Sequence, residues 1–473
     1  MKVEKVLLRS GRRVSSRDIY SLVSSSLFQS KLHYEVCELM AGQHCTSKLV
    51  KHVIENLYSS KSRRIRVVSA LIWFVEYWQD DIEKIFVLED VANILVRRGV
   101  CESKIEVVGE WRSAYIEKKF YFTLIVKAFA NRIYSFLSKP IPHGSVIVRG
   151  WVEVTASMYS SVLESAELRV FPFPYGVKRQ ARFVRDCKRK SIKCSLDGLP
   201  YSIVSAVCLF FMGKRADKAM ALIECEAYHN YARKLLMSKP KSIFTSDEFE
   251  AGAVAMYSLL IEAGVSVTNT AHGVGLYCPH VAYTSFKGFT LPQGEFYAIR
   301  NPDVDVGLRS QRNIILPLQR AEDAICFAPA FVLIHQNFED YECLADAAAL
   351  REVAGKVSEV SRNLGINFYV KIHPNTPVEA ASGVAKKFGG APVLKWEELD
   401  GVRPIFITIN STTFFDTRGY GPMLVYTGPS FHPELYFGND FFDFTIDDLE
   451  GKLENLLQPN KWLEAAIFHR GDA

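Results

Sequence analysis

Two short polar segments carry the side chains of this chain that are best suited to hold a phosphate group. The first begins at Lys371 and reads Lys-Ile-His-Pro-Asn-Thr-Pro, and the second begins at Asn410 and reads Asn-Ser-Thr-Thr. Lysine and histidine can donate charge-assisted hydrogen bonds to a phosphate, and hydroxyl and amide groups at the start of a helix can add further ones. We therefore predict phosphate contacts from six residues, Lys371, His373, Asn410, Ser411, Thr412 and Thr413.

Each of these segments follows an apolar run that is typical of a β-strand. Residues 366–370 alternate β-branched and aromatic side chains, and residues 404–409 read Pro-Ile-Phe-Ile-Thr-Ile. Ligands of open α/β sheets bind beyond the carboxyl ends of the strands, so both segments are predicted to lie at one sheet edge. The alternative interpretation is that His373 is only a turn residue before a proline and that Ser411 and its neighbours only cap a helix.

Candidates for a general base follow two strand-like runs in the first half of the chain. His272 comes after residues 265–270 and is flanked by glycines, and a neutral imidazole can accept a hydroxyl proton near pH 7. Asp247 and Glu248 come after residues 242–245, although Ser-Asp-Glu at the start of a helix is also a good N-terminal cap. The sequence leaves the choice between His272 and the two acids open.

A further loop is predicted to contact the nucleotide. It follows the apolar run at residues 423–426 and contains Gly428 and Ser430, with Glu434 shortly after them. The two carboxylate oxygens of Glu434 could accept hydrogen bonds from ribose hydroxyls. No Asp-x-Asp motif stands where a metal-dependent nucleotide-sugar enzyme would need one to hold its metal ion. The sequence therefore predicts neither an obligatory metal ion nor another cofactor.

Length and patterning predict more than one α/β domain. The chain has 473 residues, of which 48% are hydrophobic, and strand-like and helix-like segments alternate along most of it. We predict an α/β protein with two Rossmann-like domains that face a cleft, and with a helical N-terminal segment. The predicted boundaries are 1–305 for the acceptor-side domain with its helical extension, 306–445 for the nucleotide-donor domain, and 446–473 for C-terminal helices that cross back to the first domain.

Composition predicts a cytoplasmic protein. No apolar run approaches the ~20 residues that a membrane helix requires, and the first residues do not resemble a secretory signal. The net charge of +5 is too small to suggest a nucleic-acid partner. Between Lys178 and Lys193, however, basic residues crowd around a single acid, Asp186. This cluster is either an ordinary solvated face or a peripheral contact with anionic lipid at the inner face of the cell membrane, or with an anionic glycan.

The order of the short motifs resembles that of bacterial surface-polysaccharide transferases. Ala271-His-Gly is followed by Lys371-x-His-Pro and then by Ser411-Thr-Thr. The similar families are sialyltransferases and polysialyltransferases, capsule Kdo transferases, and the glycerophosphotransferases of teichoic acid synthesis. The resemblance implies a GT-B glycosyltransferase fold and a cytidine-activated donor, with its phosphate held by His373, Ser411 and Thr412.

The same resemblance leaves the transferred group open. It implies a metal-independent transferase that moves a Kdo- or sialic-type sugar from a CMP donor to a surface glycan, such as capsule, lipopolysaccharide or a glycosylated protein. The His272-Gly segment is similar to that of the glycerophosphotransferases, which implies a CDP-polyol phosphotransferase as an alternative. The sialyltransferases carry an Asp-Asp-Gly or Glu-Asp-Gly triplet that this chain lacks. A non-catalytic protein that binds a nucleotide or sugar is the third hypothesis.

Overall fold

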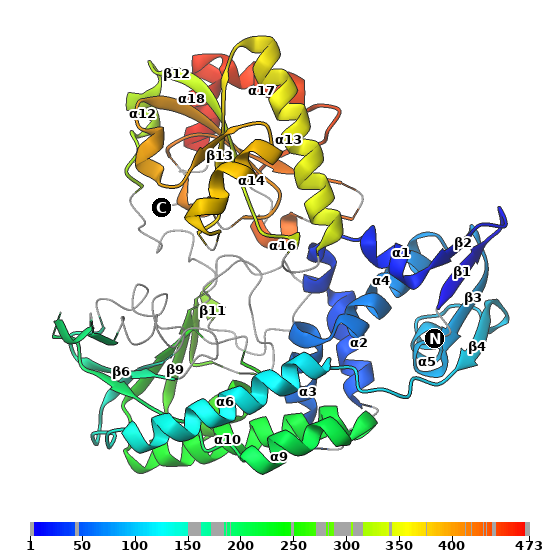
Figure 1. The fold of residues 1–473 in the computed structure, drawn as a ribbon, viewed down its shortest axis with the longest axis vertical. Coiled ribbons are helices and arrows are strands. Elements are labelled where there is room, and N and C mark those ends of the chain that lie inside the picture. Colours follow the sequence, from blue (N-terminus) through cyan, green and yellow to red (C-terminus); the bar gives the residue numbers. More distant parts are fainter. Residues whose placement is uncertain are drawn as a thin grey trace. The chain divides into compact units, whose positions relative to one another are not determined.

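The computed structural model divides the chain into two compact units (Figure 1). The first comprises Met1–Tyr20, Ser30–Gly288 and Gly294–Val306, and the second comprises Ser21–Gln29, Phe289–Gln293 and Gly307–Ala473. The structure describes residues 4–42, 47–149, 162–171, 184–185, 187–189, 191–246, 250–270, 281, 283–287, 304–305, 316–339, 343–374, 376–411, 413–417, 419–428, 430–431, 433–437 and 441–468.

The first unit begins with a small mixed sheet in the order β2-β1-β3-β4. Strand β1 pairs antiparallel with β2 and β3, whereas β3 and β4 are parallel. The hairpin of β1 and β2 was not predicted, because its strands are too short to show an alternating pattern. The predicted helical character of this region is otherwise confirmed. The elements are β1 (Lys5–Leu8), β2 (Arg13–Ser15), α1 (Ser16–Ser21), α2 (Lys31–Gly42), α3 (Lys48–Lys61), α4 (Arg63–Tyr77), β3 (Ile82–Leu88), α5 (Glu89–Arg97) and β4 (Ile105–Gly109).

A larger sheet of the first unit has the order β11-β10-β9-β8-β5-β6-β7, and all its strand pairs are parallel. Because β6 and β7 lie on one side of β5 and β8 on the other, the strand order reverses between β5 and β8. The strands are β5 (Val146–Arg149), β6 (Ala166–Val170), β7 (Cys194–Leu196), β8 (Ser242–Thr245), β9 (Ser266–Thr270), β10 (Ser285–Lys287) and β11 (Val304–Asp305). The helices are α6 (Lys118–Leu137), α9 (Ile203–Cys208), α10 (Ala216–Met237) and α11 (Ala253–Glu262).

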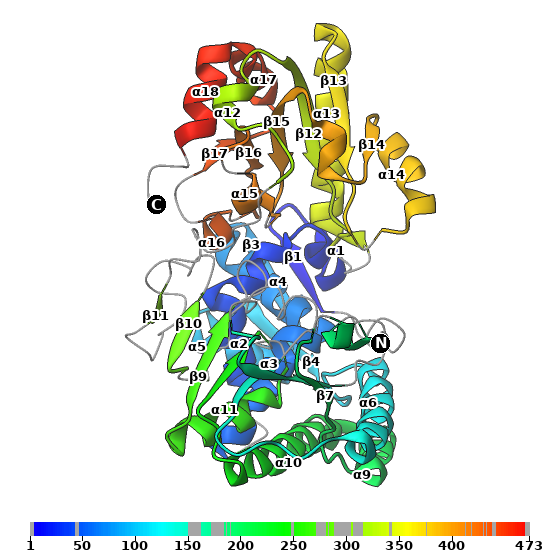
Figure 2. The same ribbon diagram turned by 90° about the vertical axis from the view of Figure 1, so that its left-hand side faces the viewer.

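The second unit contains a six-stranded parallel sheet in the order β14-β13-β12-β15-β16-β17 (Figure 2). Its order reverses between β12 and β15. The strands are β12 (Ala328–Ile334), β13 (Asn367–Lys371), β14 (Ala391–Val393), β15 (Val402–Thr408), β16 (Met423–Tyr426) and β17 (Phe442–Phe444). The helices are α12 (Ala321–Ala324), α13 (Leu344–Leu364), α14 (Ala381–Lys387), α15 (Thr413–Asp416), α16 (Glu434–Phe437), α17 (Leu449–Leu457) and α18 (Pro459–Phe468).

The fold class predicted from the sequence is confirmed. Each unit has a parallel sheet whose strand order reverses once, which is the doubly wound arrangement of Rossmann-like domains. Central strands such as β12 are buried over most of their length, as expected when helices cover both faces of a parallel sheet.

The C-terminal helices pack within the second unit, in contrast to the predicted return to the first. Leu449, Leu453 and Trp462 belong to the same apolar core as the strand residues Phe331 and Ile405. The buried indole of Trp462 donates a hydrogen bond to the carbonyl oxygen of Pro404, at 2.8 Å. The apolar faces of α17 and α18 are thus buried on the sheet that directly precedes them in the chain. None of the helices within the described ranges combines the length and the apolar character that a membrane span requires.

Candidate functional site

The strand order of the second unit places one ligand crevice at the carboxyl ends of β12 and β15. His335, Gln336 and Asn337 follow β12, and Asn410 follows β15. The side-chain nitrogen of Gln336 donates to the carbonyl oxygen of Asn410 across this position, at 3.4 Å. Beside it, a cavity of about 230 Å³ is lined by the three residues after β12 and by residues of α13, α14 and the loop after β13. In open parallel sheets, ligands bind where the strand order reverses.

Two amide oxygens at this position have no hydrogen-bond partner among the described residues. Gln336 Oε1 and Asn410 Oδ1 are both buried, and neither accepts a hydrogen bond from the described part of the chain. Leaving a buried polar atom unpaired costs about 1–3 kcal/mol, so a native structure rarely keeps one without a reason. These two acceptors are therefore the side-chain atoms best placed to accept hydrogen bonds from a bound hydroxyl or amino group.

A segment from the start of the chain completes the same sheet edge. Asp346, in the first turn of α13, is buried and accepts hydrogen bonds from Ser24 Oγ at 3.0 Å and from the Ser25 amide at 2.8 Å. Burial raises the pKa of the Asp346 carboxyl, and the hydrogen bonds from the serines oppose this shift. Asn410 Nδ2 in turn donates to Ser25 Oγ, at 3.3 Å. The serine segment thus positions Asn410. Nothing in the sequence of the serine segment indicated that it belongs to a site.

The loop after β16 is bound to the same serine segment. Ser430 Oγ accepts a hydrogen bond from the Ser24 amide at 3.1 Å and donates to the carbonyl oxygen of Leu22 at 3.2 Å. These contacts occupy the Ser430 hydroxyl that was predicted to contact a nucleotide. Gly428 lies close to the Tyr426 hydroxyl, so a Cβ added at this position would be only 3.0 Å from that oxygen. Glu434 begins α16 and is exposed.

Lys371 points away from the reversal of strand order, in contrast to its predicted phosphate contact. Its ammonium group donates to the carbonyl oxygens of Leu394 at 2.8 Å and Ile372 at 3.3 Å, and lies 5.0 Å from the ring centre of Trp396. Desolvation lowers the pKa of this lysine. His373, two residues further, is half-buried on the loop after β13. His373 therefore lies near the carboxyl ends of the strands, whereas the Lys371 ammonium group is bound beside β14.

The structure brings the predicted hydroxyl residues together as a local cap. Ser411 Oγ accepts a hydrogen bond from the Thr413 amide at 3.3 Å and donates to Thr413 Oγ1 at 3.1 Å. The Ser411 amide donates to Thr408 Oγ1 at 3.1 Å. This geometry favours the capping interpretation of Ser411 and Thr413. Thr412 lies outside the described residues.

The candidate bases of the first unit, His272, Asp247 and Glu248, all lie outside the described residues, directly after β9 and β8. The described ends of the neighbouring strands are polar. Arg149, the last residue of β5, is buried and donates to the Tyr257 hydroxyl at 2.7 Å. Asn269 in β9 is fully buried, and within the described chain neither atom of its amide has a partner. Sequence analysis missed both residues because each lies inside a run that reads as an ordinary strand.

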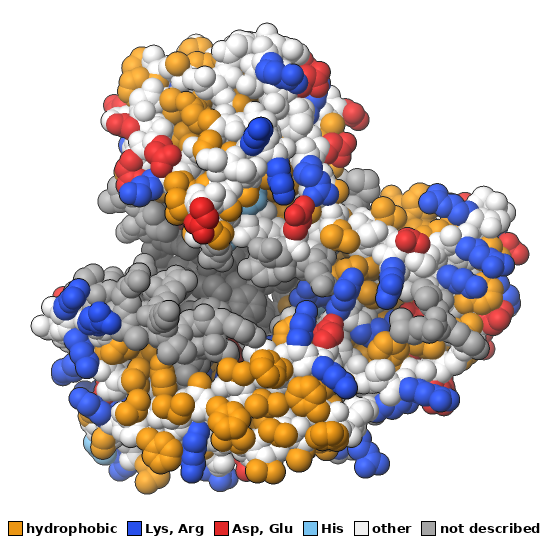
Figure 3. Space-filling model, viewed as in Figure 1, with side chains coloured by type: hydrophobic (Ala, Val, Ile, Leu, Met, Phe, Trp, Pro, Cys, Tyr) orange, Lys and Arg blue, Asp and Glu red, His pale blue; other side chains and the backbone are white. Residues whose placement is uncertain are grey.

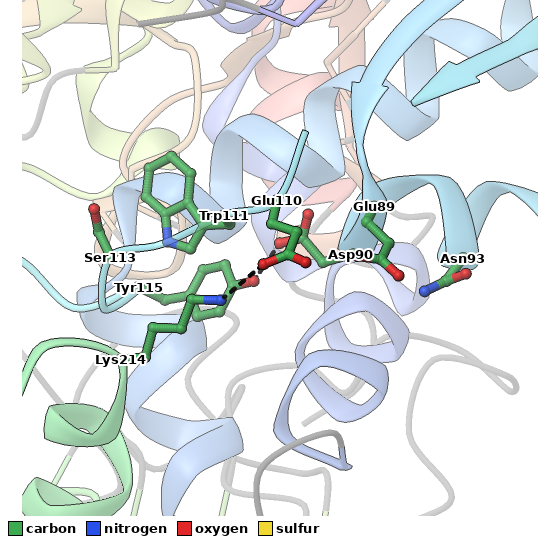
Figure 4. Close-up of a pocket in the computed structure, with 8 residues that line it drawn as sticks. All are labelled: Glu89, Asp90, Asn93, Glu110, Trp111, Ser113, Tyr115 and Lys214. Carbon is green, nitrogen blue, oxygen red and sulfur yellow. Dashed lines mark hydrogen bonds and ion pairs between the residues drawn. The ribbon is translucent and has the colours of Figure 1, made fainter. Parts of the chain in front are cut away.

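A separate pocket of about 350 Å³ lies where the parallel strands β3 and β4 end (Figure 4). The Tyr115 hydroxyl donates to Asp90, and the Lys214 ammonium lies 3.8 Å from a Glu110 oxygen. The Trp111 indole nitrogen is buried, and no described residue accepts its hydrogen bond. The pocket thus combines aromatic rings with carboxylates. It is lined by Glu89, Asp90, Asn93, Glu110, Trp111, Ser113, Tyr115 and Lys214.

Comparisons with known proteins found likenesses among solved structures. No known family model and no curated protein matches the sequence. MurG of Acinetobacter baumannii is 9% identical with a TM-score of 0.43, over 70% of this chain and 96% of that one. The spinosyn rhamnosyltransferase SpnG, solved with thymidine diphosphate, is 12% identical with a TM-score of 0.38, over 69% and 95%. The lipopolysaccharide outer core galactosyltransferase WaaB is 12% identical with a TM-score of 0.36, over 69% and 96%.

We base the functional inference on the polar side chains at the strand ends and not on these likenesses. Sequence reasoning located the carboxyl ends of β13, β15 and β16. It missed Gln336, Asp346 and the serines at 24–26, which the fold brings to the same edge. Gln336 could have been found, because it lies two residues after the apolar run at residues 330–334. Asp346 could not, because its partner Ser25 is 321 residues away in the chain.

Proposed function

We propose that the protein is a glycosyltransferase whose nucleotide-sugar donor binds where β12 and β15 end. The observation that carries this proposal is the pair of buried, unpartnered amide oxygens of Gln336 and Asn410 at the reversal of strand order. Ribose and sugar hydroxyls are donors that such oxygens can accept. A second parallel sheet, with its own polar strand ends at Arg149 and Asn269, supports a reaction that joins two substrates.

For the donor we propose a CMP-activated sugar of Kdo or sialic type, which the order of the short motifs supports. An acceptor hydroxyl oxygen attacks the anomeric carbon while the bond between that carbon and the phosphate oxygen breaks. CMP leaves with the electron pair, and His373 stabilises the charge that develops on its phosphate. His272, or one of Asp247 and Glu248, takes the proton of the acceptor hydroxyl. In this assignment the residues that contact the donor follow strands of the second unit, and the base follows a strand of the first unit.

A CDP-polyol phosphotransferase is the second candidate, favoured by the His272-Gly segment. In that reaction the acceptor oxygen attacks phosphorus, and CMP is again the leaving group. Both candidates require a cytidine nucleotide, so they share the first test and differ in the product that forms.

Cytidine nucleotides are expected to bind more tightly than the others in a calorimetric titration with CMP, CDP, UDP, GDP and ADP. Replacing His373 with alanine is expected to weaken CMP binding about 10- to 150-fold, because a charge-assisted hydrogen bond contributes roughly 1.5–3 kcal/mol. His143→Ala, at an exposed histidine of the first unit, is the matched control and should bind like wild type. A preference for UDP, GDP or ADP would overturn the cytidine assignment, and no binding of any nucleotide would overturn the donor site.

We also propose that a neutral sugar of the acceptor glycan binds in the pocket of β3 and β4. The partly exposed Trp111 indole lines the pocket as an apolar surface for a sugar, and Glu89, Asp90 and Glu110 can accept hydrogen bonds from its hydroxyls. Because the pocket has three carboxylates and one ammonium group, an anionic sugar would be repelled.

Trp111→Ala is expected to weaken binding of neutral oligosaccharides about fivefold, since losing a contact worth about 1 kcal/mol has this effect. Saturation-transfer NMR and titration with gluco-, galacto- and N-acetylglucosamine oligomers, beside sialic acid, would measure it. Trp78→Ala is the control, because Trp78 is an exposed tryptophan of the same unit. Equal binding of sialic acid, or an unchanged affinity in Trp111→Ala, would exclude the proposed pocket.

A further inference from the structure

Helix α6 has an apolar stripe that faces solvent. Its exposed side chains include Phe122, Phe129, Ile133 and Phe136, with 60%, 53%, 60% and 77% of their surfaces accessible. These positions are spaced by seven, four and three residues, which places them on one side of a helix. Its buried residues Tyr121, Leu124, Ala128 and Asn131 lie on the opposite side. A surface helix normally has one apolar stripe, which faces the core, so the second stripe on α6 has no role in the core of the unit.

The stripe continues onto a neighbouring element. Helix α9 and the 3-10 turn Leu209–Phe211 both contact α6. There, Val204 is 75% exposed and Phe211 is 87% exposed. Figure 3 shows apolar side chains gathered over this part of the first unit. Soluble monomers rarely expose a contiguous apolar patch of this kind, and where they do it usually marks an interaction site.

The charged residues on these two segments are of one sign. Residues 118–139 and 203–215 contain basic residues but no aspartate or glutamate. The exposed ones include Lys119, Arg132, Lys139 and Arg215, at both ends and along the length of the stripe. The Arg132 guanidinium lies over the Phe136 ring, 5.3 Å from its centre, so cation and apolar group share one surface. A bilayer with anionic headgroups is complementary to such a surface, because apolar side chains enter the acyl boundary while cations remain at headgroup level.

We infer that the face formed by α6, α9 and the turn Leu209–Phe211 binds the surface of an anionic lipid bilayer. This inference does not depend on the proposed transferase activity. It also differs from the peripheral contact predicted for residues 178–193, a segment of which only a part is described. On α6 and α9 the cations lie beside a broad apolar surface. Its side chains can insert into the bilayer, which charged side chains alone do not do. A protein that modifies a surface glycan would thereby be held beside a membrane-bound acceptor.

Flotation with vesicles tests the inference on the full-length protein. Wild type is expected to float with vesicles of phosphatidylcholine containing about one third phosphatidylglycerol, and to stay in the soluble fraction with pure phosphatidylcholine. High salt should reduce flotation, because surface charges are then screened. The double variant Phe136→Glu/Phe211→Glu should lower partitioning at least tenfold. Both side chains are exposed, so the variant should fold, which an unchanged circular dichroism spectrum and thermal unfolding midpoint would verify independently of the lipid result.

The matched control is Val107→Glu/Val378→Glu, which adds the same charge at exposed apolar positions elsewhere, and it should float like wild type. Wild type that stays soluble with anionic vesicles would overturn the inference, and so would equal flotation of the Phe136→Glu/Phe211→Glu variant. Light scattering tests the other possible partner of this face, which is a second copy of the chain. A dimer in the absence of lipid that the double variant dissociates would likewise overturn the bilayer assignment.

Discussion

The double substitution Gln336→Ala/Asn410→Ala is expected to weaken nucleotide binding about 100-fold. Both side chains place a buried, unpartnered oxygen at the reversal of strand order in the second unit. If each oxygen accepts one hydrogen bond from the nucleotide, the loss is roughly 1–1.5 kcal/mol per bond, and the two bonds together approach two orders of magnitude in affinity. In the protein without ligand, the substitutions remove two unpaired buried acceptors but also the hydrogen bonds that Gln336 Nε2 and Asn410 Nδ2 donate, so a loss of stability of about 1 kcal/mol per bond at most is expected.

The measurement is calorimetric titration of the double variant with the nucleotide that wild type prefers. Asn363→Ala provides the control, because Asn363 is exposed at the far end of α13, near the amino edge of the sheet. Thermal unfolding without nucleotide checks that both variants are folded. A double variant that binds within about threefold of wild type would show that the nucleotide contacts other groups, and the donor site would have to be placed elsewhere.

The sequence allowed the parallel strands to be located because their cores are short runs of β-branched and aromatic residues. Residues 404–409 were predicted as a strand, and β15 spans Val402–Thr408. The run ending at Lys371 is likewise β13, which spans Asn367–Lys371. Central strands of a parallel sheet are buried on both faces, so their hydrophobic runs are recognisable without any partner. The polar residue that follows such a run then lies at the carboxyl edge of the sheet, as Asn410 and His373 do.

What the sequence could not show depends on contacts between distant residues. Gln336 and Asn410 face each other because β12 and β15 are adjacent in the sheet. In the chain, β13 and β14 lie between these two strands. The contacts of Lys371 were not predicted, because its ammonium group donates to carbonyl oxygens beside β14, a packing detail that no local pattern encodes. The choice of base among His272, Asp247 and Glu248 stays a prediction.

Replacing Lys127 with methionine is expected to destabilise the first unit by about 3 kcal/mol. Lys127 on α6 lies 2.7 Å from a Glu250 oxygen and 3.7 Å from an oxygen of the buried Glu224. A Cβ at Gly252 would lie 2.3 Å from the Tyr228 ring beside this group, so the packing leaves little room for water. Removing the shared cation leaves two carboxylates in a poorly solvated site, and breaking a buried ion pair on one side costs roughly 3–5 kcal/mol.

The pH dependence of the unfolding midpoint distinguishes this cause from a simple loss of packing. Burial by itself would raise the pKa of Glu250, but the Lys127 ammonium overrides burial and lowers it from 4.5 to about 2. A lowered carboxyl pKa stabilises the folded state above pH 4.5, and this contribution is lost as the pH falls toward 2. In Lys127→Met, burial is opposed only by the smaller Coulombic effects of Lys61 and Arg149, and the carboxyl pKa rises. The folded state then loses stability as the pH increases from 4.5 to neutral.

Urea unfolding of the wild type and of Lys127→Met across this pH range would show slopes of opposite sign. Arg351→Met is the control, since Arg351 and Glu339 form an ion pair with side chains 54% and 65% exposed, and such surface pairs contribute little. If Lys127→Met lowers the midpoint equally at every pH, the lysine contributes packing by its aliphatic stem and not charge. Parallel pH profiles in wild type and variant would therefore contradict the electrostatic account. Glu250 lies two residues after Glu248, so opposite slopes would also show that the charge of Lys127 stabilises the segment that carries the acidic candidates for the base.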